Sequence, residues 1–561
     1  MSEIDPITLE VLWSRLRGIP QEMGEHLRRT AFSAVMKYSD DFSTCLFTAD
    51  GRLLAQGVYT PGHLGSMPFT LRSLLDDHFG IDEWEPGDVV LTNNPYINSG
   101  HLPDLIMYEP AFVDGDLVGF SATTGHHVDV GGPAPGSYTM RVSDMHGEGL
   151  QLPPLKFVEG GELNDEVLDI ITENSREPKK IRGDVHAQRN ANRTGVELYQ
   201  ELIEEFGAET VKRYEETILE RTEQAMREAI RELPNGTYDF EDKLDGFEEP
   251  LPVRVEVAVE DDEITIDFTG TAPQQQHYAI NSPRNYTFSY VMMAIKSIVD
   301  PDTPQTHGTI EPIQMNAPER TIVNPRPPVP VASRQLLSNR IVSAINGALY
   351  EAVPEAIPAS GAQLFRGSIK FTDPETGEQK ILQDRIYGGA GAWATRDGFP
   401  AVSGDTNVKN IPVEVIEREY PVRIARYELV PDSAGPGRYR GGSATQRVYE
   451  FDRSAELQFC NDRFRFGPYG LGGGQSGQTG RAIVNPDTAA ETNLSSTAEY
   501  EIEENDVLHL YTCGGGGYGP PKERADDAVR KDVRNGLVSA AQAREVYGAD
   551  GEWATDGGME E

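Results

Sequence analysis

Histidines gather in one part of this sequence of 561 residues. Six of the eleven fall between positions 63 and 146: His63, His78, His101, His126, His127 and His146. One of them opens the string "HLPD", where His101 stands three residues before Asp104 in a segment rich in Gly, Pro and Asn. An imidazole and a carboxylate at this spacing either cap a turn or supply two ligands of a metal site. The string alone favours the turn, so the question is which other side chain reaches it.

A predicted hairpin brings a second histidine to this string. Two β-rich runs flank Asp114–Gly115, and Asp-Gly between such runs is a strong signal for a two-residue turn. With that turn, antiparallel pairing sets Asp104 opposite Gly125. His126 then lies within a residue or two of Asp104, although 25 positions separate His126 from His101.

A bulge in the hairpin would change which histidine lies beside Asp104. Pro110 lies inside the first run, and a bulge there shifts the register by one, which would bring His127 in place of His126. Two imidazoles and one carboxylate with open positions suit manganese, iron or zinc. In the alternative interpretation, His101 caps a loop and the His126–His127 pair belongs to a polar strand end.

Both helices and β-hairpins are predicted around these side chains. A helix cap at Asp5, followed by apolar residues at helical spacing, predicts one or two helices to about Ala34. Hairpins are expected around Asp50–Gly51 and Asp114–Gly115, and later come charged helical patterns broken at Gly207. We therefore predict a mixed α/β (α+β) fold with five regions: 1–160, α/β with the metal site; 161–235, helical; 236–420, α/β; 421–520, β-rich; and 521–561, a helical tail with a disordered end.

Charge limits the partners of this chain. Asp and Glu number 90 against 50 Lys and Arg, a net charge of -40, which argues against nucleic acid and anionic membranes as partners. Only 12 of the basic residues are lysine, and this acidic, lysine-poor composition is typical of proteins adapted to high salt; an ordinary acidic protein is the alternative.

Three scattered cysteines, no long apolar run and no signal segment favour a cytoplasmic location.

The glycine-rich stretches do not match nucleotide-binding loops. "GGGQSG" at 472–477 fits the pattern G-x-G-x-x-G by letter, but no helix is expected after it. "CGGGGYGPP" lacks the lysine and hydroxyl residue of a phosphate-binding P-loop. We interpret both stretches as loops and expect this chain not to bind ATP by such a device.

Several strings, in order along the chain, resemble the hydantoinase B/oxoprolinase family. They are "YSDDFSTCLFTADGRLLAQG", "PGHLGSMP", "GDVVLTNNPYINSGHLPD", "GHHVDVGGPAPGSY", "DFTGTAPQ", "YELVPDSAGPGRYRGG" and "CGGGGYGPPKERADDAVRKDVRNGLVSAAQAREVYG". The likeness covers about residues 5–547 as one family unit. It is far more specific than any single motif above.

The resemblance implies a subunit that works with a hydantoinase A-type partner, which holds ATP and Mg and phosphorylates the substrate carbonyl. In the carboxylase branch of the family, the matching region binds manganese through two histidines and an aspartate, which by position are His101, Asp104 and His126. A divalent metal is therefore implied, manganese first, with zinc or iron as alternatives. His127 and Asp129 are predicted to assist catalysis by orienting a ligand or moving a proton.

The implied activity is ATP-dependent opening of a hydantoin or 5-oxoproline ring, in the manner of N-methylhydantoinase and 5-oxoprolinase. The alternatives are a ketone carboxylase of the acetone type, a non-catalytic scaffold subunit, and an iron oxygenase, for which the usual His-x-Asp spacing is absent. Two strings depart from those usual in relatives, "PQTHGTIEPIQM" and "PVPVASRQLLSNR". Because both could contact the substrate, its class, a lactam, hydantoin or ketone, stays open.

Overall fold

The computed structural model describes residues 4–402 and 404–549, and these fold as a mixed α/β protein, as predicted. The chain divides into two compact units. The first comprises Met1–Thr237, Glu256–Ser338 and Asn407–Lys409, and the second comprises Tyr238–Val255, Asn339–Thr406 and Asn410–Glu561. The five regions predicted from the sequence are a finer division, which stays a prediction. The predicted disordered end falls almost entirely outside the described residues.

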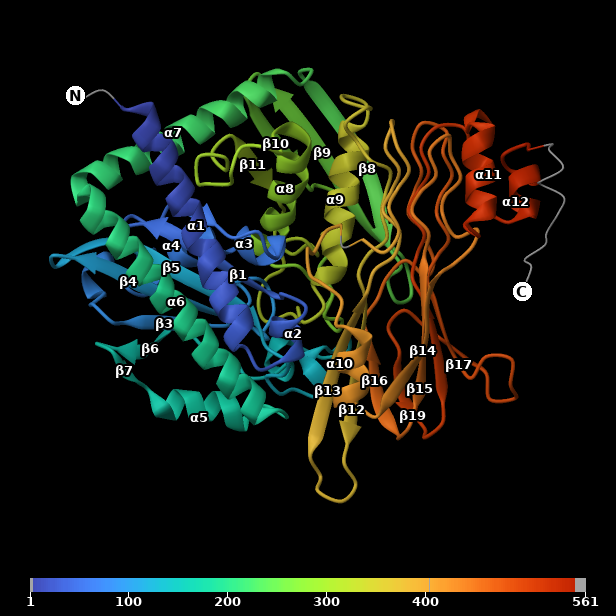
Figure 1. Ribbon diagram of the computed structural model, residues 1–561, viewed down its shortest axis with the longest axis horizontal. Helices are drawn as coiled ribbons and strands as arrows, with labels where there is room; N and C mark the ends of the chain where they lie inside the picture. Colours follow the sequence, from blue (N-terminus) through green and yellow to red (C-terminus); the bar gives the residue numbers. More distant parts are fainter. Residues whose placement is uncertain (1–3, 403, 550–561) are drawn as a thin grey trace. The chain divides into compact units, whose positions relative to one another are not determined.

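A seven-stranded antiparallel sheet forms the centre of the first unit (Figure 1). Its strand order is β2-β1-β5-β4-β3-β6-β7. The strands are β1 (Phe42–Thr48), β2 (Leu53–Gln56), β3 (Val89–Thr92), β4 (Asp104–Val113), β5 (Asp116–His126), β6 (Leu155–Glu159) and β7 (Glu162–Leu163). Both predicted hairpins are present, since β1 pairs with β2 and β4 pairs with β5.

The register of the β4–β5 hairpin differs by one residue from the simple expectation. Val113 faces Asp116 at the turn, but a bulge between Ala111 and Phe112 shifts the pairing beyond it. Asp104 therefore lies opposite His126 and not opposite Gly125. The expectation that His126 lies within a residue or two of Asp104 therefore holds, and the alternative, in which a bulge at Pro110 brings in His127, does not, because the observed shift sets His126 directly against Asp104.

Helices pack on both faces of this sheet. The first unit contains α1 (Pro6–Thr30), α2 (Ala34–Lys37), α3 (Pro61–Leu64), α4 (Met67–Asp77), α5 (Asp165–Glu173), α6 (Pro178–Phe206), α7 (Ala208–Arg231) and α8 (Arg284–Val299). Because neighbouring residues of a strand point to opposite faces, Leu46 joins the core under α1 and α6, while Phe47 joins the core with α4 (Figure 1). Asp5 caps α1 as predicted, and Gly207, at φ 83°, separates α6 from α7.

A buried carboxyl joins α6 to α7. The hydroxyl of Tyr199 donates a hydrogen bond to Glu215, and both side chains are buried. Burial is the main influence on this carboxyl and raises the pKa of Glu215 from about 4.5 to about 7, although the bond from Tyr199 opposes the rise. Glu215 is therefore protonated in the folded chain at mildly acidic pH, where an unfolded chain is already ionised.

This raised pKa predicts a loss of stability as pH rises. The contribution of Glu215 is fully present below about pH 4.5 and is lost as pH passes through about 7. Glutamine is neutral throughout, so the Glu215→Gln variant has no such loss. Between pH 4.5 and 8, its free energy of unfolding should therefore rise by about 2–3 kcal/mol relative to that of the wild type. Urea denaturation at both pH values measures this difference, with exposed Glu220→Gln as control. A difference that stays constant with pH would contradict the assignment.

Four strands form a second, smaller sheet in the order β11-β10-β9-β8. They are β8 (Gly236–Leu244), β9 (Leu251–Glu260), β10 (Glu263–Asp267) and β11 (Ile313–Asn316), and β8 and β9 each run across the boundary between the units. Helix α9 (Gln335–Leu349) also crosses it. No helix among the described residues is long and apolar enough to cross a membrane.

The second unit is built mainly of antiparallel strands in two sheets, ordered β13-β12-β16-β19 and β14-β15-β20-β17-β18. The strands are β12 (Phe365–Thr372), β13 (Gln379–Ile386), β14 (Val422–Leu429), β15 (Thr445–Phe451), β16 (Ala455–Phe459), β17 (Arg481–Val484), β18 (Thr492–Leu494), β19 (Glu499–Ile502) and β20 (Val507–Tyr511). Its shorter helices are α10 (Val413–Glu419), α11 (Asp526–Arg534) and α12 (Ala540–Glu545).

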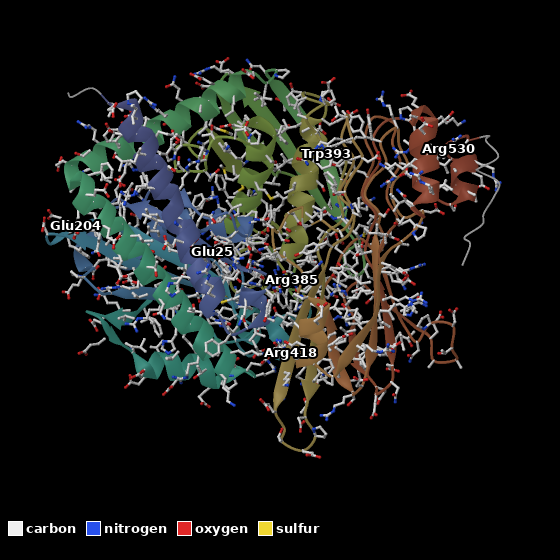
Figure 2. The ribbon with its side chains drawn as sticks, in the orientation of Figure 1. Glu25, Glu204, Arg385, Trp393, Arg418 and Arg530 are labelled. Atoms are coloured by element: carbon white, nitrogen blue, oxygen red, sulfur yellow. The ribbon has the colours of Figure 1, made fainter. Side chains whose placement is uncertain are left out.

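Charged side chains lie both at the surface and in the interior of the protein. Glu204 projects to solvent from α6 in the first unit, whereas Arg385 on β13 lies inside the second (Figure 2). Fully buried Arg340 on α9 is bound by two aspartates: its Nε lies 2.7 Å from Asp462 Oδ2, and its Nη1 lies 3.0 Å from Asp242 Oδ1. Burial opposes ionisation of Asp242, but the guanidinium charges outweigh it and hold the pKa of this carboxyl below its usual value.

The glycine-rich stretches pack backbone against backbone in the second unit. The amide of Gly515 donates to the carbonyl of Gly442, and that of Gly516 donates to Ser360. A Cβ added at Gly515 would overlap the carbonyl oxygen of Ala390. These segments are irregular, as predicted. At Gly474, Gly477 and Gly514–Gly517 glycine is required, because another stretch of backbone occupies the place of a side chain.

Candidate metal centre

The "NNPYINSGHLPD" stretch between β3 and β4 is held by its own amide side chains. Asn93 Nδ2 donates to the carbonyls of Leu102, at 2.8 Å, and Leu150, at 2.9 Å. Asn98 Nδ2 donates to the carbonyl of Asp104, also at 2.9 Å. Both amides are fully buried. The loop therefore has a fixed shape where it enters β4, and that entry point is the "HLPD" string.

Three side chains converge at this point. Asp104 Oδ1 lies 2.7 Å from His101 Nε2 and 2.8 Å from His126 Nδ1, and the two nitrogens are 3.1 Å apart. All three side chains are buried. Among the described residues, His101, Asp104 and His126 form a group whose ligand atoms lie within 4.8 Å of one another, as a metal site requires. The hairpin register supplies His126, and the loop supplies His101.

The second carboxylate oxygen of Asp104 has its own partners. Ser99 Oγ donates to Asp104 Oδ2 at 2.5 Å, Arg334 Nη2 donates at 2.6 Å, and His63 Nε2 lies 3.2 Å away. Burial opposes the charge of this carboxylate, but His101, His63 and Arg334 outweigh it and hold the pKa of Asp104 well below its usual value. Asp104 is therefore an anion with one oxygen anchored and the other turned toward two imidazoles.

Each imidazole is also fixed from behind. His101 Nδ1 lies 3.2 Å from the carbonyl oxygen of Ala332 and 3.3 Å from Arg334 Nη1. The Tyr138 hydroxyl lies 3.3 Å from His126 Nε2. Burial, and then the charge of Arg334, lower the pKa of His101 to about 3, so this imidazole is neutral at physiological pH. A neutral imidazole held through its second nitrogen is the form that binds metals.

The chemistry of the donor set fits a divalent cation. Two imidazole nitrogens and a carboxylate oxygen face one point, and three such acceptors repel one another unless a proton or a cation lies between them. Ligand atoms at about 2.1 Å from one metal ion are themselves about 3 Å apart, close to the observed separations. A cation in front of His101 Nε2 also selects the tautomer in which Nδ1–H donates to Ala332.

Two other predicted residues are not brought to this group. His127 Nε2 lies 2.7 Å from Gln188 Oε1 on α6, because successive residues at the end of β5 point in opposite directions. Burial lowers the pKa of His127 to about 4. Asp129 pairs with Arg176 at 2.7 Å and accepts backbone amide bonds, so it fixes a loop.

Four neighbours of the group were not assigned to the site from the sequence: His63, which was noted only as one of the clustered histidines, and Ser99, Tyr138 and Arg334. His63, Ser99 and Tyr138 lie in strings that carry the family resemblance, whereas Arg334 lies in "PVPVASRQLLSNR", one of the two departing strings. The other departing string does not join the group. There His307 approaches Glu311 at 3.1 Å, and its backbone amide donates to Leu53.

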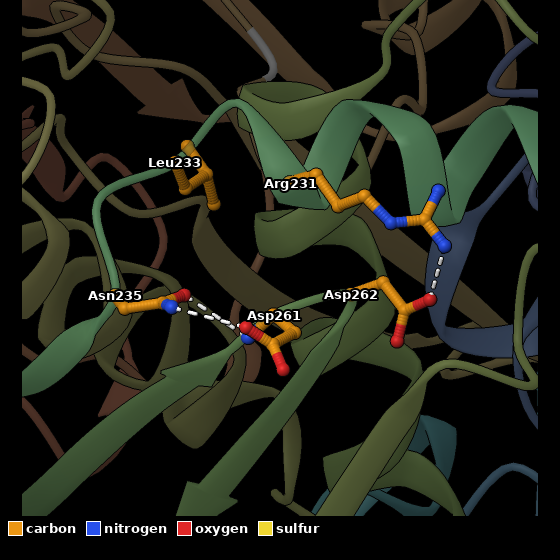
Figure 3. A pocket seen from close by; sticks show the side chains of 5 residues that line it. All are labelled: Arg231, Leu233, Asn235, Asp261 and Asp262. Carbon is orange, nitrogen blue, oxygen red and sulfur yellow. Dashed lines mark hydrogen bonds and ion pairs between the residues drawn. The ribbon is translucent and has the colours of Figure 1, made fainter.

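A solvent-exposed hollow in the first unit shares no residue with the histidine group (Figure 3). It lies where the end of α7 meets the turn between β9 and β10. Asn235 is hydrogen-bonded to Asp261, and Arg231 pairs with Asp262. The lining residues are Arg231, Leu233, Asn235, Asp261 and Asp262. Asp262 is thus already paired and Asp261 is bonded to an amide, and among the described residues no ligand set converges in this hollow.

The chain belongs to the hydantoinase B/oxoprolinase family, whose model matches residues 5–521. A protein of Pseudomonas sp., named as the B-type subunit of a putative D-/L-hydantoinase, is 33% identical over 98% of this chain and 95% of that protein. The crystal structure of the ATP-dependent caprolactamase from Pseudomonas jessenii contains a chain with a TM-score of 0.89 and 28% identity, covering 98% of both chains.

An acetone carboxylase structure has the same fold, also with a TM-score of 0.89. Its identity is only 19%, over 97% of this chain and 79% of the carboxylase chain. This second structural likeness therefore concerns the fold and not the reaction.

Proposed function

We propose that this chain is part of an ATP-dependent hydrolase that opens a cyclic amide, with a hydantoin or 5-oxoproline as substrate. The observation that carries the proposal is the buried group of His101, Asp104 and His126 in a member of this family. Relatives named as a B-type hydantoinase component and as an ATP-dependent caprolactamase support both the reaction class and the need for a further component. The partner is a hydantoinase A-type subunit, which holds ATP and Mg.

The chemistry of amides explains why two subunits would take different steps of the reaction. A planar amide resists attack because resonance stabilises its carbonyl group. Phosphorylation of the carbonyl oxygen by the partner removes that resonance and leaves an electrophilic carbon. Opening the ring then needs water to add to this carbon and the C–N bond to break as the nitrogen takes up a proton, which leaves an acyl phosphate that a second water hydrolyses to carboxylate and phosphate. Delivery of the water to the carbon falls to the present chain.

His101, Asp104 and His126 would hold a divalent cation, with manganese first and zinc or iron as alternatives. When bound, such a cation lowers the pKa of water and polarises a carbonyl group. Asp104 supplies the negative charge of the site, and Ser99 and Arg334 fix the direction in which its oxygens point. Burial of all three ligands keeps bulk water away, which strengthens every electrostatic interaction there.

His127 and Asp129 take supporting roles in this proposal. Through Gln188, His127 fastens the end of β5 to α6 and so fixes the position of the adjacent ligand His126. Through Arg176, Asp129 fixes the loop that follows. Neither side chain is assigned a proton transfer, since both are already engaged by these partners.

The test is reconstitution with a hydantoinase A-type subunit. We expect ATP-dependent ring opening of 5-oxoproline or a hydantoin, with ADP formed in step with product, and no product when either subunit or ATP is omitted. Caprolactam and acetone with bicarbonate complete the panel. ATP-dependent carboxylation of acetone without hydrolysis of any cyclic amide would replace this proposal with a ketone carboxylase. Full activity of the A-type subunit alone would show that this chain takes no part in catalysis.

A further inference from the structure

We propose that Glu148 is a positioning residue of the metal centre, because it fixes the turn at 331–334 that orients both His101 and Asp104. This inference rests on the proposed metal centre. Glu148 directly follows the short helix Met145–Gly147 and lies outside the two strings that contain the ligands. It therefore acts from a third segment of the chain.

The contact between Glu148 and the turn is direct. Glu148 Oε1 accepts hydrogen bonds from the backbone amides of Val331, at 2.6 Å, and Ala332, at 2.7 Å. The side chain is buried, with 1% of its surface exposed. One carboxyl oxygen therefore fixes two successive peptide groups of the turn, which sets the direction of the carbonyl that follows them.

The same turn supplies two contacts of the metal centre. The carbonyl oxygen of Ala332 lies 3.2 Å from His101 Nδ1. Two residues later, Arg334 Nη2 donates to Asp104 Oδ2 at 2.6 Å, and Arg334 Nε donates to the carbonyl of Ser99. Glu148 thus acts on two ligands at once through the turn that it binds.

The flanks of the turn have anchors of their own. The Tyr96 hydroxyl donates to the carbonyl of Val329 at 2.7 Å, and Asn281 Nδ2 donates to the carbonyl of Pro330 at 2.8 Å. On the other side, the amide of Ser333 donates to the carbonyl of Ala279 at 2.8 Å. Removal of Glu148 should therefore loosen the peptide groups of 331–332 without releasing the whole segment.

Because the Glu148 carboxyl is largely protonated, glutamine is the conservative replacement for it. Burial is the main cause that raises the pKa of Glu148 to about 8, and the two amide bonds oppose it. At neutral pH the carboxyl is therefore largely uncharged, as the side-chain amide of glutamine is. Glutamine keeps an oxygen that can accept both backbone bonds, whereas alanine removes it.

Metal affinity of the full chain in complex with its A-type partner tests the inference without an activity assay. After removal of metal with a chelator, the protein is titrated with Mn²⁺ in competition with a chelating dye. We expect Glu148→Ala to raise the dissociation constant by about 10–100-fold, the usual effect of losing an outer partner of a metal ligand. Glu148→Gln should stay within about threefold of the wild type, because both backbone bonds remain.

Glu215→Ala is the matched control, since Glu215 is another buried carboxyl of the first unit but is bonded to Tyr199. It should leave the dissociation constant unchanged even if it lowers the melting temperature. Unchanged affinity in Glu148→Ala, or an equal loss in Glu215→Ala, would overturn the positioning role while the metal centre stands. If the wild type itself binds no Mn²⁺, Zn²⁺ or Fe²⁺, the metal centre fails and the inference fails with it.

Discussion

The Asp104→Asn variant is expected to lose its bound metal and at least about 100-fold of its turnover, more than the loss of an outer partner usually costs. Asparagine has nearly the shape of aspartate, so the loop and the hairpin can keep their positions. It lacks the negative charge, however, and leaves Arg334 and the two imidazoles around a neutral group. A cation at this point would then meet a buried positive charge without compensation.

Metal content per folded chain and ATP-dependent turnover with the A-type partner measure this effect. Asp88→Asn is the matched control, because Asp88 is also a buried aspartate paired with a basic side chain, that of Lys156, but lies outside the ligand group. It should keep its metal. Wild-type metal content and turnover in Asp104→Asn would show that the convergence of His101, Asp104 and His126 serves the fold alone.

Replacing Arg340 with methionine should give the largest change in stability. Asp242 and Asp462 would remain buried without the guanidinium that binds both of them. Removing one member of a buried ion pair costs about 3–5 kcal/mol, because the charge left behind is neither solvated nor paired. We expect the free energy of unfolding of the second unit to fall by that amount, as measured by calorimetry and urea denaturation.

Two further variants separate this explanation from a general loss of packing. Adding Asp462→Asn to Arg340→Met should recover part of the loss, since Asp462 is then uncharged while Asp242 keeps the buried guanidinium of Arg463 at 3.7 Å. Arg423→Ala removes an exposed partner of Glu450 and should change stability by less than about 1 kcal/mol. An Arg340→Met variant as stable as the wild type would contradict the role assigned to the cluster.

Local patterns were enough to predict much of the first unit. The Asp5 cap, the Gly207 break and the two Asp-Gly hairpins each depend on neighbouring residues, and the structure contains all of them. The hairpin also predicted that His126 meets Asp104, which lies directly opposite it. The predicted register was wrong by one residue, because the hairpin turn alone does not show the bulge between Ala111 and Phe112, and several positions near a strand proline can hold one.

The contacts that the sequence could not predict join segments far apart in the chain. Arg334 reaches Asp104 from 230 positions away, and no short pattern joins two such segments. Glu148 and Ala332 are 184 positions apart and meet for the same reason. The hypothesis of adaptation to high salt, which depends on surface charge alone, stays a prediction.

The glycine segments of the second unit also limit how its length can change. Irregular segments are usually where a chain accepts inserted or deleted residues. Here the run Gly514–Gly517 lies with each glycine against a carbonyl oxygen of another residue, as Gly515 does against Ala390. One residue inserted before this run would place a residue with a side chain where only a hydrogen atom fits. Insertions should therefore be confined to the hairpin ends, and these segments should keep a constant length.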